Sequence, residues 1–149
     1  ISITEAALSE NHIQLITNFD QEITIYGYDN ELKQAILNII QNAKDALLEK
    51  LTINDDRFIF IDTQIEDNFV TVIIKDNAFG IPIKIIDDIF AQNFTTKEES
   101  GGTGVGLYMT KEIIEKHMKG TVLVSNVEYT YKNIQCKGAE FILKFQANR

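Results

Sequence analysis

Cysteine, proline and tryptophan are rare or absent in this sequence. It has one cysteine, Cys136, one proline and no tryptophan among 149 residues. A single cysteine excludes an internal disulfide and is compatible with a reducing, cytoplasmic setting. No apolar run approaches the roughly 18 residues of a membrane-spanning helix, so we expect no direct membrane contact. Because the chain starts at Ile1 and not at methionine, we expect a domain of a longer parent protein, which could itself be membrane-anchored.

Basic residues are also scarce. Lys and Arg number 14 against 22 Asp and Glu, which gives a net charge of −8. A nucleic-acid partner needs a basic face, so none is expected, whereas a nucleotide needs only local donors and a metal. Apolar residues make up 44%, which favours one globular domain over residues 1–149.

Three segments have helical patterns. Asp29–Lys50 carries an apolar stripe at helical spacing, with Asp29 as a possible N-cap. Pro82 suits the first position of a short helix through Phe90, and a third helix is predicted over Thr103–Lys119.

Strand-like segments alternate irregularly with these helices. We predict strands at His12–Thr17, Glu22–Tyr26, Phe58–Glu66, Phe69–Lys75, Thr121–Val127 and Ala139–Phe145. Asp67-Asn68 predicts a hairpin turn, and Glu128–Lys137 a loop. The pattern predicts an α/β two-layer sandwich, in which a mixed, mostly antiparallel sheet carries about three helices on one face.

Four segments suggest chemistry. The first is Gly101–Leu107, where four glycines in six residues open a predicted helix. Such a loop lets a ligand approach the main chain, and the helix start offers free N–H groups that suit phosphate. The alternative is a purely structural turn.

The second segment lies on the long helix. Asn38 and Asn42 are four residues apart and share a helical face, with Asp45 following. Asparagine is a poor helix former, so the pair suggests oxygen ligands for Mg²⁺. The alternative is an ordinary exposed polar face.

The third and fourth segments are Asp76–Gly80 and Phe90–Lys97. A carboxylate at a strand end can accept a hydrogen bond from an exocyclic amine, and Gly80 allows the turn that follows. In Phe90–Lys97 the hydroxyls of Thr95 and Thr96 and the ammonium of Lys97 suit phosphate, while two phenylalanines could anchor a flap. An ordinary turn and a surface loop are the alternatives.

Along the chain the paired asparagines come first, then Asp76–Gly80, then Phe90–Lys97 and last the glycine loop. In that order the four segments resemble the ATP-binding domain of sensor histidine kinases, which share a Bergerat-type fold with DNA gyrase, Hsp90 and MutL. The resemblance extends from about Ile13 to Phe145 and is closest to the subgroup whose lid carries Phe-Thr-Thr-Lys. It implies that Asp76 binds the adenine amino group and that Asn42 coordinates Mg²⁺, with Asn42 and Lys97 as catalytic residues. The implied site comprises Asn38, Asn42, Asp45, Asp76, Gly80, Ile81, Thr95, Thr96, Lys97, Gly102, Thr103, Gly104, Val105, Gly106 and Leu107.

Some positions depart from the family pattern. Ala78 replaces a glycine of the family motif that Asp76–Gly80 resembles. Ala91, Gln92 and Asn93 change the middle of the lid, which is expected over 83–100. ATP-hydrolysing relatives have a general-base glutamate where this chain has Asn38, and an amide cannot accept a proton at neutral pH.

The resemblance therefore implies a kinase domain that supplies the γ-phosphoryl group of ATP to a histidine on a separate helical-hairpin dimerisation domain, with a response regulator as an indirect partner. That hairpin is expected to be absent here, and His12 and His117 are expected to be structural or surface residues. We therefore expect a monomer that does not phosphorylate itself. The alternatives are an ATP-gated conformational ATPase of the gyrase, Hsp90 or MutL type, and an interaction domain that has lost nucleotide binding.

Overall fold

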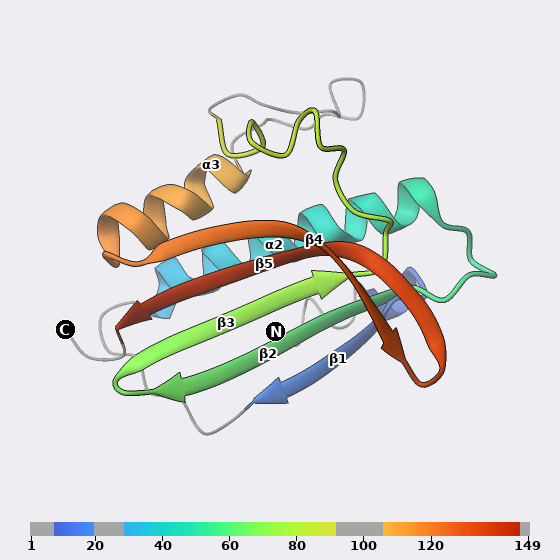
Figure 1. The fold of residues 1–149 in the computed structure, drawn as a ribbon, viewed down its shortest axis with the longest axis horizontal. Helices are drawn as coiled ribbons and strands as arrows, with labels where there is room; N and C mark the ends of the chain where they lie inside the picture. The colour runs from blue at the N-terminus through green and yellow to red at the C-terminus, as the bar shows by residue number, and fades with distance from the viewer. Residues whose placement is uncertain (1–7, 20–28, 92–105, 147–149) are drawn as a thin grey trace.

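Five strands form one sheet in the order β1-β2-β3-β5-β4, and helices cover one of its faces (Figure 1). The computed structural model describes residues 8–19, 29–91 and 106–146. The strands are β1 (Gln14–Phe19), β2 (Phe58–Glu66), β3 (Phe69–Asp76), β4 (Thr121–Tyr131) and β5 (Ile134–Gln146). β1 runs parallel to β2, and every other pair is antiparallel. The predicted mixed, mostly antiparallel sheet is confirmed.

Helix α2 (Asp29–Lys50) has the predicted bounds and runs behind the sheet in Figure 1. Ala35, Ile39, Ala43 and Leu47 recur every four residues and are fully buried or nearly so. This spacing places them on one side of the helix. The opposite side carries most of the polar residues of the helix.

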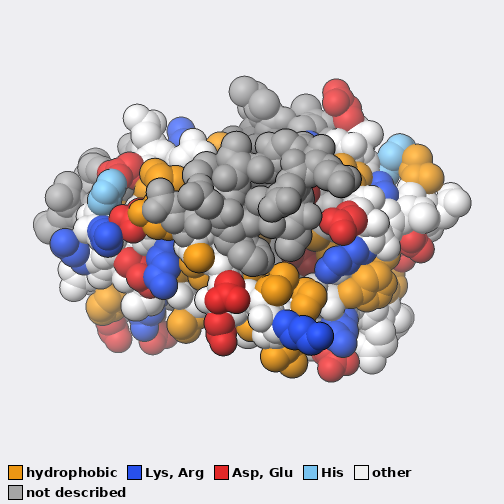
Figure 2. Space-filling model, turned by 90° about the horizontal axis from the view of Figure 1, so that it is seen from above, with side chains coloured by type: hydrophobic (Ala, Val, Ile, Leu, Met, Phe, Trp, Pro, Cys, Tyr) orange, Lys and Arg blue, Asp and Glu red, His pale blue; other side chains and the backbone are white. Residues whose placement is uncertain are grey.

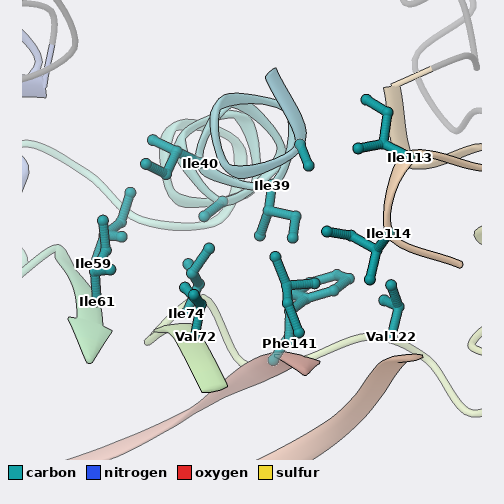
Figure 3. Close-up of a cluster of buried hydrophobic side chains, with 14 of the residues drawn as sticks. Ile39, Ile40, Ile59, Ile61, Val72, Ile74, Ile113, Ile114, Val122 and Phe141 are labelled. Atoms are coloured by element: carbon teal, nitrogen blue, oxygen red, sulfur yellow. The ribbon is translucent and has the colours of Figure 1, made fainter. Parts of the chain in front are cut away.

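The core lies between α2, the second helical segment and the sheet (Figure 3). Burial alternates along β3, where Val70, Val72 and Ile74 face the helices. This alternation is the period expected of a strand with one covered face. Side chains that meet in this core from both layers are Ile39, Ile40, Ile59, Ile61, Val72, Ile74, Ile113, Ile114, Val122 and Phe141.

The second helical segment begins as α3 (Gly106–Lys111) and continues as a π-helical turn, η2 (Glu112–His117). The predicted helix extends to Lys119, but the segment ends at His117, and Lys119 has a left-handed φ of 59° that a helix cannot include. Its predicted first residues, 103–105, lie outside the described residues, as does the predicted strand Glu22–Tyr26. The predicted strand at His12–Thr17 is shifted, because His12 adopts a φ of 58° and β1 begins at Gln14.

The loop predicted over Glu128–Lys137 is wrong. β4 and β5 continue through it as a hairpin, and only Lys132-Asn133 turns, with φ values of 48° and 67°. The end of this hairpin bends past the end of β3 (Figure 1). There Tyr129, Tyr131 and Cys136 pack on Phe58 and Phe60, forming a second, smaller core on the other face of the sheet. These long-range aromatic contacts keep the polar segment extended.

The short helix predicted over Pro82–Phe90 is also wrong, so α2 and the α3–η2 segment are the helices that cover the sheet in the described residues. A series of turns replaces it. Pro82 O accepts from both Ile85 N and Ile86 N, but the next bonds run from Asp88 N to Ile85 O and from Ala91 N to Asp88 O. These three-residue spacings do not continue the ladder of an α-helix.

Charges are mixed over the described surface. On the face shown in Figure 2, Lys and Arg side chains lie interspersed with Asp and Glu side chains. The net charge of −8 is therefore not gathered there in one block. No helix within the described ranges is long and apolar enough to cross a membrane.

Candidate functional site

Asp76 ends β3 in a buried position, with only 5% of its surface exposed. Its Oδ1 accepts hydrogen bonds from Ala78 N at 2.9 Å and from Ala139 N of β5 at 3.3 Å. Gly138 makes this approach possible, because a Cβ there would lie 1.8 Å from Asp76 O. Both of these hydrogen bonds from described residues end on Oδ1.

Burial raises the pKa of the Asp76 carboxyl. The hydrogen bonds from Ala78 and Ala139 and the charge of Lys50 oppose that effect. The result is a carboxyl group with little water around it. A ligand N–H donor is worth more at such a group than at an exposed one.

Asn77 and Ala78, which follow Asp76, have structural roles. Asn77 Oδ1 accepts from Phe58 N at 2.8 Å, and its Nδ2 donates to Asp56 O at 2.9 Å, which ties the connection to the start of β2. The Ala78 methyl is buried in the main core. The left-handed φ values fall on Phe79 (72°) and Gly80 (88°). The alanine that departs from the family motif therefore stands where the backbone does not need glycine.

The peptide from Gly80 to Ile81 is held by two side chains from other elements. Lys50 Nζ, at the end of α2, donates to Gly80 O at 2.9 Å. Asn126 of β4 accepts from Ile81 N at 2.7 Å and donates to Ile81 O at 2.8 Å. Ile81 itself is half-buried against the core. The site thus continues from the carboxylate into a fixed segment of backbone.

Tyr129 adds a further contact from the β4–β5 hairpin. Its hydroxyl donates to Asp76 O at 2.6 Å, and burial raises its pKa, so it remains a donor at neutral pH. Sequence reasoning missed the parts played by Lys50, Asn126 and Tyr129. No local pattern marks them, because each lies 30 or more residues from the backbone atom that it contacts.

Asn38 connects α2 to the first residue of α3. Its Nδ2 donates to Gly106 O at 2.9 Å, and its Oδ1 accepts from Gln34 Nε2 at 2.8 Å. Thr110, fully buried, places its Oγ1 3.1 Å from the same Gly106 oxygen and 3.2 Å from Ala35 O. The start of α3 is therefore fixed on the polar side of α2.

Some of the remaining predicted site residues lie within the described ranges, and the others lie outside them. Asn42 is half-buried on α2, as is Asp45, whose Oδ1 accepts from Gln41 Nε2 at 3.0 Å. Leu107 is half-buried in α3, and Phe90 packs edge-on against Phe141. Outside the described residues lie Phe94, Thr95, Thr96, Lys97, Gly102, Thr103, Gly104 and Val105.

Comparison with known sequences gives the family. Residues 27–149 match the histidine kinase-, DNA gyrase B- and HSP90-like ATPases. The chain belongs to this ATPase family. Sporulation kinase A of Bacillus subtilis is 35% identical over 117 residues, which cover 78% of this chain and 18% of that protein. The signal transduction histidine-protein kinase AtoS of Escherichia coli is 31% identical over 126 residues, covering 84% of this chain and 19% of that protein.

Solved structures in this ATPase family share the fold. The nucleotide-free catalytic domain of histidine kinase ThkA superposes with a TM-score of 0.76 at 24% identity, over 99% of this chain and 89% of that chain. The present chain spans less than a fifth of the length of the two curated relatives. Its length is instead close to that of the solved ThkA catalytic domain, of which it covers 89%.

Proposed function

We propose that this domain binds Mg-ATP and supplies its γ-phosphoryl group to a histidine on a separate dimerisation domain of a two-component sensor kinase. The observation that carries the proposal is Asp76. It is a buried carboxyl at a strand end, oriented by two backbone N–H groups and flanked by the fixed Gly80–Ile81 segment. An adenine amino group supplies the donor that such an acceptor needs, and Ile81 offers an apolar wall for the ring.

The phosphate end fits the same ligand. Asn38 and Thr110 hold the first residue of α3 against α2, and N–H groups in the first turn of a helix lack acceptors within it. Asn42 lies on the same helix face as Asn38, and its side-chain amide oxygen is a hard ligand of the kind that Mg²⁺ prefers. Mg²⁺ takes few protein ligands. When bound, the ion neutralises phosphate charge. Lys97, Thr95 and Thr96 are proposed to reach the terminal phosphates from the lid.

Asn38 favours phosphoryl transfer over hydrolysis. Its amide donates to Gly106 O and accepts from Gln34, and it cannot take a proton from water. A neutral histidine nitrogen is already a nucleophile, so the domain would act mainly by positioning and charge neutralisation. An ATP-gated conformational ATPase is the second candidate, and measurable ATP turnover by the isolated chain would favour it.

The proposed partners follow from the family. The dimerisation domain would present the histidine, and a response regulator would then receive the phosphoryl group. A fold relative, histidine kinase ThkA, has been solved in complex with the response regulator TrrA, at a TM-score of 0.71 and 22% identity over 98% of this chain and 37% of that chain. In this chain His117 Nδ1 pairs with Glu31 Oε2. Because the acceptor histidine would lie on that separate dimerisation domain, we expect no label on the isolated chain after incubation with γ-labelled ATP.

The test is calorimetric titration of the chain with a non-hydrolysable ATP analogue, with and without Mg²⁺. Asp76→Asn should weaken binding by at least about tenfold, because it removes a charged acceptor. Asp67→Asn makes the same charge change in the exposed β2–β3 turn and should bind like the unmodified chain. Failure of the unmodified chain to bind, or equal binding by Asp76→Asn, would overturn the proposal.

A further inference from the structure

Asn126 lies on the face of β4 that points toward the helices, although it is exposed at the edge of the sheet. Its side-chain amide meets both polar groups of Ile81, accepting from the N–H at 2.7 Å and donating to the C=O at 2.8 Å. Such two-point pairing is what a neighbouring strand would provide. One side chain thereby fixes both the position and the orientation of a residue 45 positions away in sequence.

The strand register joins this contact to the buried carboxylate. Asn126 is paired with Ala139 across β4 and β5, and Ala139 N donates to Asp76 Oδ1. One cross-strand pair therefore touches both ends of the Asp76–Ile81 connection. A displacement of Asn126 would change the spacing between Ile81 and the Asp76 carboxylate.

Gly80 shows how closely the amide approaches this connection. A Cβ at Gly80 would lie 2.6 Å from Asn126 Oδ1, closer than real Cβ atoms come, and the φ of Gly80 is 88°. Glycine is therefore favoured twice at this position, once by its own backbone angle and once by the close approach of Asn126. The two residues form a matched pair from separate parts of the chain.

We propose that Asn126 is a positioning residue for the base end of the nucleotide site, an inference that rests on the proposed function. Its amide holds Ile81 at the distance from Asp76 at which the wall and the acceptor engage one purine together. Its side chain is exposed, and exposed hydrogen bonds contribute little to global stability. Its main effect is therefore on ligand affinity.

The test compares Asn126→Ala and Asn126→Asp with the unmodified chain. The aspartate keeps an oxygen for Ile81 N–H but loses the donor to Ile81 O. Ser125→Ala changes the neighbouring exposed residue, whose side chain points to the other face, and serves as the control. We would measure the Kd of the ATP analogue by calorimetry, the backbone amide chemical shift of Ile81 by NMR, and the thermal unfolding midpoint.

We expect Asn126→Ala to raise the Kd by about tenfold, the equivalent of two weak hydrogen bonds, with Asn126→Asp in between and Ser125→Ala unchanged. The Ile81 amide signal should shift in Asn126→Ala even without nucleotide, while the unfolding midpoint stays near that of Ser125→Ala. A purely structural role would move the midpoint and leave the Kd of the folded protein unchanged.

The outcomes separate the two proposals. If the unmodified chain binds the analogue but Asn126→Ala binds it equally well, the positioning role is overturned and the proposed function stands. If the unmodified chain binds no nucleotide, both fall. Gly80→Ala should weaken binding less in the Asn126→Ala background than in the unmodified chain, because one of its two conflicts is gone. Equal losses in both backgrounds would contradict the matched pair.

Discussion

Two turns on either side of β3 are built differently. The turn before the strand, Asp67-Asn68, takes left-handed φ values of 53° and 69° and joins strands that pair up to Glu66 and Phe69. The connection after it, Asp76–Ile81, is held by Lys50, Asn126 and Tyr129 from distances of 30, 45 and 53 residues. The first turn is a local property of the chain. The second is a property of the whole sheet, and it is the one that forms the candidate site.

If this contrast is correct, the largest loss of stability should come from adding a Cβ at Gly138, which contacts the backbone of the second turn. A Cβ in Gly138→Ala would meet Asp76 O at 1.8 Å, and backbone cannot move away as a flexible side chain can. We expect the free energy of unfolding to fall by about 3 kcal/mol, the upper range for overpacking, as measured by urea unfolding.

Gly106→Ala is the control for that substitution. Among the described residues, its new Cβ would have Asn38 Cβ as its nearest neighbour at 4.0 Å, an ordinary contact, and alanine is the better helix former. Its stability should be equal to or greater than that of the unmodified chain. If Gly138→Ala and Gly106→Ala unfolded at the same urea concentration, the close packing of β5 against the Asp76–Ile81 connection would not matter for stability. The proposed distinction between the two turns would then be lost.

A smaller, pH-dependent effect is expected from Asp76→Asn. Burial raises the pKa of this carboxyl above its ordinary value of 3.8, so the folded state binds the proton more tightly than the unfolded state does. Below 3.8 both states are protonated and no penalty exists. As the pH rises through the raised folded-state pKa, ionisation destabilises the fold.

The asparagine lacks this penalty. Its stability advantage over the unmodified chain should therefore grow from acidic toward neutral pH and then level off, in urea midpoints collected across pH. Asp67→Asn, in the exposed local turn, serves as the control for the charge change. If the stability advantage of Asp76→Asn over the unmodified chain shrank toward neutral pH, the assigned direction of the pKa shift would be contradicted.

Lys50→Met should act more weakly, because Lys50 is exposed. The change removes the donor to Gly80 O and a positive charge that lowers the pKa of Asp76. The Asp76 carboxyl should then titrate at a higher pH in an NMR titration, and stability should fall by about 1 kcal/mol or less. Lys33→Met, on an exposed position of the same helix, should leave this titration in place. A downward shift in Lys50→Met would show that the ammonium does not act on Asp76.

The smallest effect is expected at the local turn. Asn68→Gly relieves a left-handed residue with a φ of 69° and completes the preferred chemistry of a two-residue hairpin. We expect a gain of about 0.5 kcal/mol, with no change in nucleotide affinity by calorimetry. A change in affinity would mean that the β2–β3 turn is coupled to the site after all.

The same contrast explains what could be predicted from the sequence. The bounds of α2, of β2 and of the turn between β2 and β3 follow from periodicity and from one turn dipeptide, and they were predicted as the structure has them, while β3 runs one residue further than predicted, to Asp76. The continuation of β4 and β5 through Glu128–Lys137 was not, because Phe58 and Phe60 supply the contacts that extend it. The helix predicted after Pro82 failed in the same way, since Ile89 and Phe90 are drawn onto the core instead of completing helical turns.

The residues of the candidate site also fall into those that local motifs reveal and those that only the folded sheet reveals. Asp76, Gly80 and Asn38 could be selected because each belongs to a short motif with recognisable chemistry. Asn126 and Tyr129 could not, since an asparagine and a tyrosine in a strand carry no signal until the sheet brings them to Ile81 and to Asp76 O. The family resemblance also gave no warning that Ala78 lies inside the core.

The small core beneath the β4–β5 hairpin has a practical consequence. Cys136 is the only thiol in the chain, its side chain is buried there at 5% exposure, and burial raises its pKa. Thiol-directed reagents need an accessible thiolate, so this cysteine should react slowly. A cysteine introduced by Ile83→Cys, at a position that is 83% exposed, would carry a fluorophore or spin label almost alone. The native cysteine should therefore take up little label, so that the signal would come from the segment that follows Ile81.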